Sequence, residues 1–262
     1  MRPNVHAALP FALLFALLGG CDGSASAQNA APAASAAAVA PAAPSAAMAT
    51  GGEAAAKRLE VRRGRGSFLI DAPLEKIKGA SEEAKGWIEL DAADLTRSKG
   101  ELALRLTALR TTTFGDEKKD AAQSGHARNW LEVGDESPAA SKAAHEYARF
   151  RLQSLTTDTP ALAAVPEREG KRTVRLKATG DVTVHGVSVP RTVPLVAEFE
   201  GPASAPTAVS VRSEGPFDVS LKKHDVKPRD TLGKFLDGAL EKVGKKIDDR
   251  VQVSVEFRAE RP

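Results

Sequence analysis

Residues 171–199 alternate between apolar and polar side chains so regularly that they predict two strands of a β-hairpin. Over residues 173–184 the apolar side chains fall on even positions and the polar ones on odd positions, which gives one dry face and one wet face. The alternation resumes over residues 193–199, after His185 and Gly186. We therefore expect these two residues to form the turn of an antiparallel hairpin whose dry face meets a core.

The same two-residue spacing recurs along the chain. Apolar pairs and triplets two apart begin near residue 68 and continue to residue 257, separated mainly by Gly, Pro, Asp and Ser. With a further strand expected over residues 74–78, the pattern predicts roughly eight to ten strands. Long helical patterns do not alternate with them, so the fold class is all-β, with an antiparallel barrel of about eight strands preferred over βαβ.

Two segments interrupt the strands. Residues 230–247 carry apolar side chains at helical spacing, so they predict an amphipathic helix in the C-terminal region, capped by Asp230 or Thr231. We expect it to pack on the barrel, either permanently or as a lid over a cavity, through Leu232, Phe235, Leu236, Ala239, Leu240 and Val243. Residues 113–147 predict one or two short surface helices, with Trp130 as a core plug or a cover over a barrel mouth.

The N-terminus is typical of an exported bacterial protein. Arg2 is followed by an apolar run over residues 7–18, which is too short to span a bilayer and is typical of a signal peptide. The run ends at Leu18-Gly19-Gly20-Cys21, which resembles the bacterial lipoprotein processing box. We predict a lipoprotein signal peptide at residues 1–20 and a lipidated Cys21 in the cell envelope, facing the periplasm, with the choice of membrane left open.

Residues 21–57 differ in composition from the rest. They are mostly Ala, Pro, Ser and Gly, which cannot bury enough surface to offset ordering, so we predict a disordered tether. Residues 58–262 then form one folded domain. Without residues 1–20 the chain has 36 Lys and Arg against 34 Asp and Glu, spread along the strands, which argues against a nucleic-acid partner. Cys21 is the sole cysteine, so no intramolecular disulfide can form.

The hairpin also carries a family resemblance. Residues 179–190 read TGDVTVHGVSVP and resemble the G-D-L-T-I-H-G-V-T-x-P hairpin of the YceI-like family of bacterial envelope proteins. Residues 86–91, 109–111 and 147–154 are similar to other strands of that family in order and spacing, whereas residues 126–131 depart from its pattern. The resemblance implies a lipocalin-like barrel that encloses a polyisoprenoid or a similar long apolar amphiphile.

The dry faces of the strands supply candidates for the lining of such a barrel. A barrel of about eight strands is either filled by its own side chains or holds one small ligand, and the sequence leaves both open. The candidate lining residues are Leu104, Leu106, Val174, Leu176, Val182, Val184, Val193, Leu195, Ala197, Phe199, Val253, Val255 and Phe257.

No pattern in the sequence predicts catalysis. The four histidines beyond residue 20 (His126, His145, His185 and His224) form no short-spaced pair, so no metal site is predicted. We expect a local hydrogen bond for His185 in the hairpin and a solvated strand end at His224. A lipid-binding protein without cofactors is therefore our main hypothesis. The alternatives are an anchored assembly module with a solid barrel and a protein partner, or an enzyme acting on an envelope lipid; the oligomeric state stays open.

Overall fold

The computed structural model describes residues 58–71, 76–227 and 249–262. Within these ranges the strands are β1 (Arg58–Asp71), β2 (Lys76–Ser81), β3 (Ala84–Glu89), β4 (Lys99–Arg105), β5 (Arg110–Thr111), β6 (Tyr147–Thr156), β7 (Lys171–Val184), β8 (Val187–Glu200), β9 (Ala208–Ser213), β10 (Phe217–Ser220) and β11 (Arg250–Glu260). The α-helices described are α2 (Glu117–Trp130) and α3 (Ala139–His145). Four 3-10 turns complete the set: η1 (Leu95–Arg97), η2 (Leu106–Ala108), η3 (Leu162–Ala164) and η4 (Lys222–His224).

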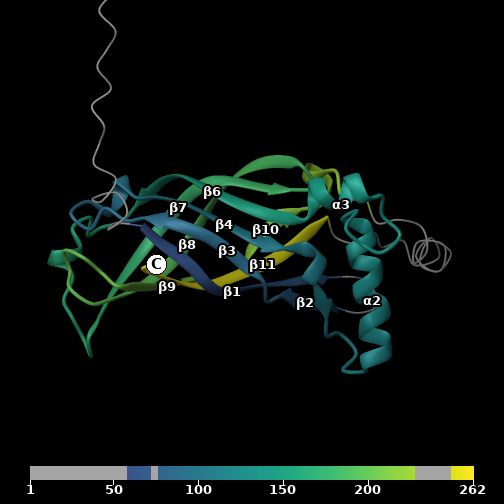
Figure 1. The fold of residues 1–262 in the computed structure, drawn as a ribbon, viewed down its shortest axis with the longest axis horizontal. Coiled ribbons are helices and arrows are strands. Elements are labelled where there is room, and N and C mark those ends of the chain that lie inside the picture. Colours follow the sequence, from purple (N-terminus) through teal and green to yellow (C-terminus); the bar gives the residue numbers. More distant parts are fainter. Residues whose placement is uncertain (1–57, 72–75, 228–248) are drawn as a thin grey trace, which may run out of the picture. The chain divides into compact units, whose positions relative to one another are not determined.

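Eight of the strands close into a ring. Their order is β1-β3-β4-β6-β7-β8-β9-β11, every neighbouring pair is antiparallel, and β11 pairs with β1 to close it (Figure 1). Strands β2, β5 and β10 lie outside this ring: β2 pairs with the second half of β1, β5 with β2, and β10 with the start of β11. The predicted all-β fold with a barrel of about eight strands is confirmed.

The β7–β8 hairpin forms as the alternation predicts. The two strands pair without a shift from Lys171 opposite Glu200 to Val184 opposite Val187. His185 and Gly186 make the two-residue turn, with φ of 52° and 75°. Positive φ at both central residues is what a type I′ turn requires, because its twist matches that of the strands it joins.

The barrel has two unlike ends, and one of them is closed by 3-10 turns. We call it the capped end; it carries η1, η3 and residues 201–207, and β1 begins there. Two backbone hydrogen bonds join the segment around η1 to the segment around η3. The Leu95 amide donates to the Pro160 carbonyl at 2.8 Å, and the Leu162 amide donates to the Ala92 carbonyl at 3.0 Å. Leu95 and Leu162 are 1% and 0% exposed, so they complete a continuous apolar core at this end.

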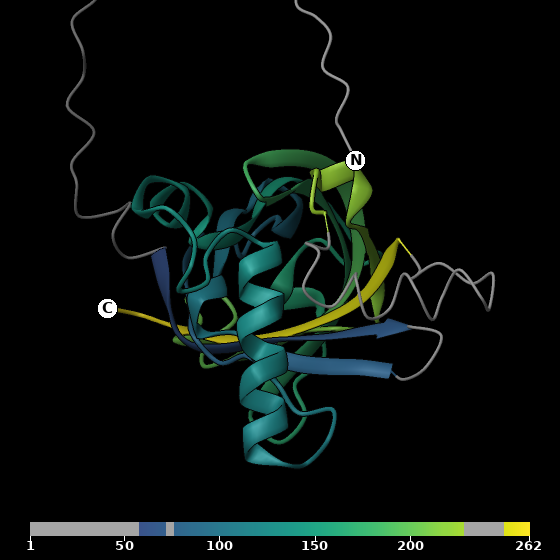
Figure 2. The same cartoon turned by 90° about the vertical axis from the view of Figure 1, so that its right-hand side faces the viewer.

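The other end carries α2, α3, η4 and the turn at His185 and Gly186, and we call it the helical end. Helix α2 runs across this end of the barrel (Figure 2). Asp116 caps it by accepting from the Lys119 amide at 2.9 Å. It is held to the barrel by the Thr111 amide, which donates to Ser124 Oγ at 2.8 Å, and by Ala127, which packs against the buried Leu106 and Leu109. Helices α2 and α3 confirm the helices expected within residues 113–147.

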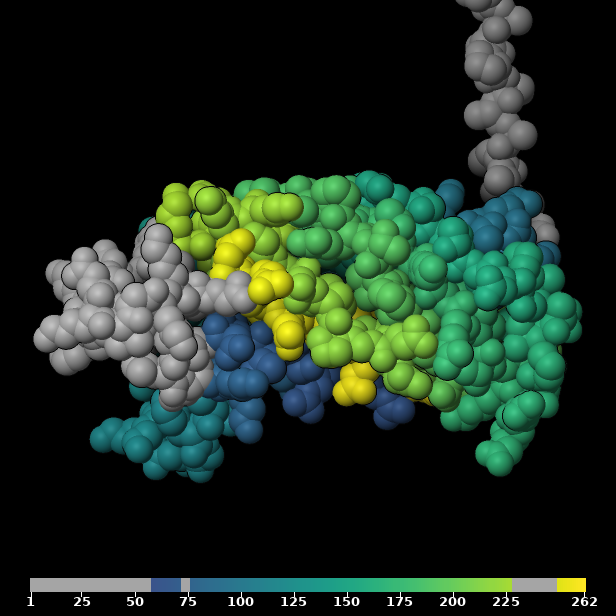
Figure 3. Space-filling model, turned by 180° about the vertical axis from the view of Figure 1, so that it is seen from behind, coloured from purple at the N-terminus to yellow at the C-terminus, as the bar shows by residue number. Residues whose placement is uncertain are grey.

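An ion-pair network ties three strands together on the outside of the barrel near the capped end. Arg258 on β11 binds Glu200 on β8 through two hydrogen bonds of 2.8 and 2.9 Å, and it also donates to Ser210 on β9 at 3.2 Å and to Glu260 at 2.6 Å. The bonds from Arg258 lower the pKa of Glu200 to about 2. Figure 3 shows part of β11 in yellow, and β11 pairs with β9. The network braces the β11 side of the ring.

Several predictions fall outside the described residues. These are the signal peptide at 1–20, Cys21, the tether, and the helix at 230–247 with its possible lid residues. Of the strand predicted over 74–78, only the part from Lys76 lies within the described residues, as the start of β2. None of the described helices is long and apolar enough to cross a membrane.

Candidate functional site

A cavity of about 290 Å³ lies inside the ring of strands. Side chains from all eight ring strands contact it, and α2 adds Ala127 and Trp130 at the helical end. All the predicted lining residues except Val174 contact this cavity: Leu104, Leu106, Leu176, Val182, Val184, Val193, Leu195, Ala197, Phe199, Val253, Val255 and Phe257. Whether they bind a ligand stays a prediction.

Val174 lies in the core instead. Its side chain is 4% exposed and packs in the apolar cluster that includes Leu162 and Phe199. It lies near the start of β7, opposite Ala197 on β8, and does not itself contact the cavity. The alternation of β7 places Val174 on the correct face but says nothing about where along the strand the cavity ends.

The cavity also contacts residues that are not among the predicted lining residues. Phe68 on β1 and Phe150 on β6 share the same two-residue spacing, so their alternation could have marked them. Ala127, Trp130 and Leu131 come from α2 and its C-terminal end, and their position depends on how the helix crosses the barrel. Trp130 is 9% exposed and thus both closes this end and borders the cavity.

The wall of the cavity is almost entirely apolar. Ser81, one of the few polar residues in contact with it, donates its hydroxyl to the Arg105 carbonyl at 2.7 Å and is therefore satisfied. Of the charged residues in contact with it, Glu101 and Arg149 pair with each other at 3.3 Å and are partly exposed. No histidine within the described ranges contacts it. Such a wall favours hydrocarbon and offers little to a charged substrate.

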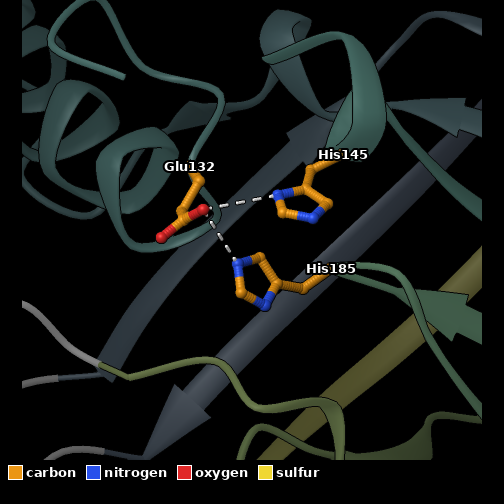
Figure 4. A group of neighbouring side chains, drawn as sticks. All are labelled: Glu132, His145 and His185. Carbon is orange, nitrogen blue, oxygen red and sulfur yellow. Dashed lines mark ion pairs between the residues drawn. The ribbon is translucent and has the colours of Figure 1, made fainter. Parts of the chain in front are cut away.

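A second group of side chains gathers at the helical end, next to the cavity. Glu132 follows α2, His145 ends α3, and His185 stands in the β7–β8 turn (Figure 4). Glu132 Oε2 lies 3.6 Å from His145 Nδ1 and 3.5 Å from His185 Nε2, and the two imidazole rings are 4.1 Å apart. The sequence did not predict this cluster, because its members lie far apart along the chain.

One ring nitrogen of each of these two histidines lacks a hydrogen bond within the described residues. His145 Nδ1 and His185 Nε2 are buried, and neither has a hydrogen-bond partner within the described part of the chain. The local hydrogen bond expected for His185 is therefore not made by Nε2. Burial lowers the pKa of His145, and the neighbouring His185 acts in the same direction, against the opposing effect of Glu132.

His224 differs from the expectation for it. We expected a solvated strand end, but His224 closes the 3-10 turn η4 and is 1% exposed. Its Nδ1 lies 2.9 Å from the Val187 carbonyl, and burial lowers its pKa. The expectation was wrong because the turn directs the ring inward, while the exposed Asp225 after it adopts a left-handed φ of 52°.

The sequence also matches a known family. The model of the YceI-like domain matches residues 58–259, which is most of the chain and nearly the whole described barrel. The chain belongs to the YceI-like family. The resemblance carried by the hairpin at residues 179–190 is thereby confirmed, and the YceI-like domain includes the cavity and the Glu132, His145 and His185 cluster.

Solved structures resemble this YceI-like chain at low identity. BcnA of Burkholderia cenocepacia shares 14% identity, with a TM-score of 0.46, and the match covers 74% of this chain and 95% of that one. A polyisoprenoid binding domain from Saccharophagus degradans, implicated in plant cell wall breakdown, shares 14% identity with a TM-score of 0.49, covering 79% and 99%. The YceI protein of Campylobacter jejuni shares 14% identity with a TM-score of 0.40, covering 70% and 84%. No curated protein matches.

Proposed function

We propose that this YceI-like protein holds a long apolar amphiphile, such as a polyisoprenoid, inside its barrel. The observation that carries the proposal is the apolar cavity enclosed by the ring of strands. Its volume of about 290 Å³ is close to the lower end of the range usual for small-molecule sites, roughly 300–1,000 Å³. A narrow hydrocarbon chain suits such a space better than a bulky ligand does.

The cavity weighs against the alternative of a solid barrel. Protein interiors pack densely, and a void of this size lined by apolar groups forfeits contacts that a filled core would make. An apolar ligand would restore those contacts. For this reason we favour lipid binding over the alternative of an anchored assembly module with a packed barrel and a protein partner.

The lining also weighs against an enzyme. Acid–base chemistry on a lipid needs titratable groups that converge on the substrate. Within the described residues, neither the buried His224 nor the partly buried His145 and His185 contact the cavity. We therefore propose binding or carriage of the amphiphile, without a chemical step.

We further propose that the barrel is a lipoprotein domain of the bacterial cell envelope, facing the periplasm. The support is the sequence Leu18-Gly19-Gly20-Cys21 at the end of an apolar run and the Ala- and Pro-rich segment that follows it. A lipidated Cys21 would hold the barrel near the membrane from which the amphiphile is drawn.

Native mass spectrometry of the purified, untagged protein tests the lipid proposal. We expect an added mass that organic extraction removes, and an extract that contains a long-chain apolar lipid. The emptied protein should then take up a fluorescent polyisoprenoid analogue with one-to-one stoichiometry. Absence of both the added mass and the uptake would contradict lipid binding.

The anchoring proposal needs a separate test. Cys21→Ser removes the thiol that would be acylated, so the variant should stay as an unprocessed precursor or appear as a soluble species. Membrane fractionation and intact-mass measurement in the native host distinguish it from the parent protein. A variant that keeps an acylated N-terminus and the mature mass would show that Cys21 is not the site.

A further inference from the structure

The Glu132, His145 and His185 cluster has the geometry of a metal site. In a tetrahedral zinc site with bonds of about 2.1 Å, neighbouring ligand atoms are about 3.4 Å apart. Glu132 Oε2 lies 3.6 Å from His145 Nδ1 and 3.5 Å from His185 Nε2, and the ligand atoms of the three residues all lie within 4.8 Å of one another. These spacings are somewhat long for hydrogen bonds and close to those of ligands around one ion.

The two imidazole nitrogens support this interpretation. His145 Nδ1 and His185 Nε2 both face the Glu132 carboxylate, yet both are buried without a hydrogen-bond partner in the described ranges (Figure 4). A buried polar atom left without a partner is costly, because it loses its hydrogen bonds to water without gaining others. A metal ion bound by the three side chains would satisfy both nitrogens together.

The backbone at Glu132 points the same way. Glu132 directly follows the C-terminal cap of α2 and has a φ of 57°, a left-handed conformation that favours glycine at this position. A glutamate in this conformation carries backbone strain that glycine would not. The backbone conformation at residue 132 alone would therefore favour glycine over glutamate.

We propose that Glu132, His145 and His185 bind a divalent transition-metal ion of the zinc type, with water as a fourth ligand. Two imidazoles and one carboxylate suit zinc, whereas magnesium and calcium prefer oxygen ligands alone. The ion would join three segments that meet at the helical end: the end of α2, the end of α3 and the β7–β8 turn. The site is separate from the lipid proposal, and neither depends on the other.

Zinc titration of the untagged, chelator-treated full chain tests this proposal. We expect one equivalent of Zn²⁺ to bind by calorimetry, and Mg²⁺ to produce no comparable signal. At about 100 times the dissociation constant, Zn²⁺ should raise the melting temperature by roughly 5–10 °C. Co²⁺ bound in the same place should give the strong visible absorption of four-coordinate cobalt.

Two variants remove ligands while keeping the backbone. Glu132→Gly places glycine in the left-handed position, and His185→Asn keeps a residue that tolerates the first position of a type I′ turn. Each should weaken Zn²⁺ binding by roughly 100-fold or more, since outer partners of metal ligands alone account for about 10–100-fold. Without metal, each should melt within a few degrees of the parent.

Matched controls separate ligand loss from backbone effects. Glu169→Gly changes an exposed glutamate that also has a left-handed φ, 51°, and His126→Asn removes a histidine outside the cluster. Both should bind Zn²⁺ as the parent does. The proposal is wrong if the parent binds no stoichiometric Zn²⁺, or if Glu132→Gly and His185→Asn bind it with the affinity of the controls.

Discussion

The capped end and the helical end of the barrel are stabilised by different kinds of contact. At the capped end, Leu95 and Leu162 fill the core, backbone hydrogen bonds join the two 3-10 turns, and Arg258 braces the outside. At the helical end a mostly polar helix crosses the barrel, a cavity extends beneath it, and buried histidine nitrogens lack hydrogen bonds within the described residues. The core and the cavity share residues such as Leu95 and Phe199, so the two ends differ mainly in what closes them: joined 3-10 turns at one end, and α2 with the histidine cluster at the other.

The largest expected effect on the free energy of unfolding comes from a charge placed in the apolar interior of the barrel, which runs between the two ends. Val182→Asp would place a carboxylate beside the apolar cavity, where Val182 is 8% exposed, and should lower the free energy of unfolding by several kcal/mol out of roughly 5–15. Thr183→Asp, one residue along on the opposite face, should change it by about 1 kcal/mol or less. Thermal midpoints measure both. Equal midpoints for Val182→Asp and the parent would mean that the interior is not dry.

A second prediction tests the difference in packing between the ends. Leu162→Ala at the capped end should lower the free energy of unfolding by about 2–5 kcal/mol, because the truncated side chain is fully buried. Leu131→Ala at the helical end should lower it by clearly less, because Leu131 is only partly buried and already borders the cavity. Urea denaturation gives both values. If the two losses were equal, the ends would be packed alike.

A third prediction tests whether the cavity can accommodate a larger side chain. Ala197→Leu adds bulk that the cavity can accept, so it should change stability by less than about 1 kcal/mol while reducing uptake of a polyisoprenoid analogue. Ala259→Leu makes the same change at a core position that does not contact the cavity, where Ala259 is 0% exposed, and should lower stability by about 1–3 kcal/mol. Denaturation and probe titration are the measurements. Unchanged uptake by Ala197→Leu would place the ligand elsewhere.

The smallest expected effects are the responses of the two ends to acid. Burial lowers the pKa of His224 in the folded state, with Arg191 adding to the effect and the Val187 and Val184 carbonyls opposing it. The unfolded chain therefore takes up this proton first, and stability falls as pH drops below about 6.5. The pKa of Glu200 is lowered from 4.5 to about 2, so its contribution is present above pH 4.5 and is lost between 4.5 and 2.

Unfolding measured over a pH series can assign these two steps. His224→Gln should flatten the change between pH 7 and 5, and Glu200→Gln should flatten the change below pH 4.5, each without altering the other range. A His224→Gln variant with the same slope as the parent between pH 7 and 5 would mean that His224 does not account for the first step.

Much of the fold follows from sequence, while the cluster at the helical end does not. The β7–β8 strands, their turn at His185 and Gly186, and nearly all the predicted lining positions could be found because alternation is a local property of a half-buried strand. Val174 shows the limit of that reasoning, because its face was predicted correctly, yet it is buried in the core without contacting the cavity. His145 and His185 meet only after the barrel closes, so no spacing could have paired them.

The sequence by itself determined which residues form strands, which of their faces are dry, and the family to which the chain belongs. These follow from side-chain period and turn chemistry, which act between near neighbours. Only the tertiary structure decided that β1 pairs with β11, that a space remains inside the ring, and that Glu132 faces two histidines. Those features depend on contacts between distant segments, whose register and spacing are set when the whole barrel packs together.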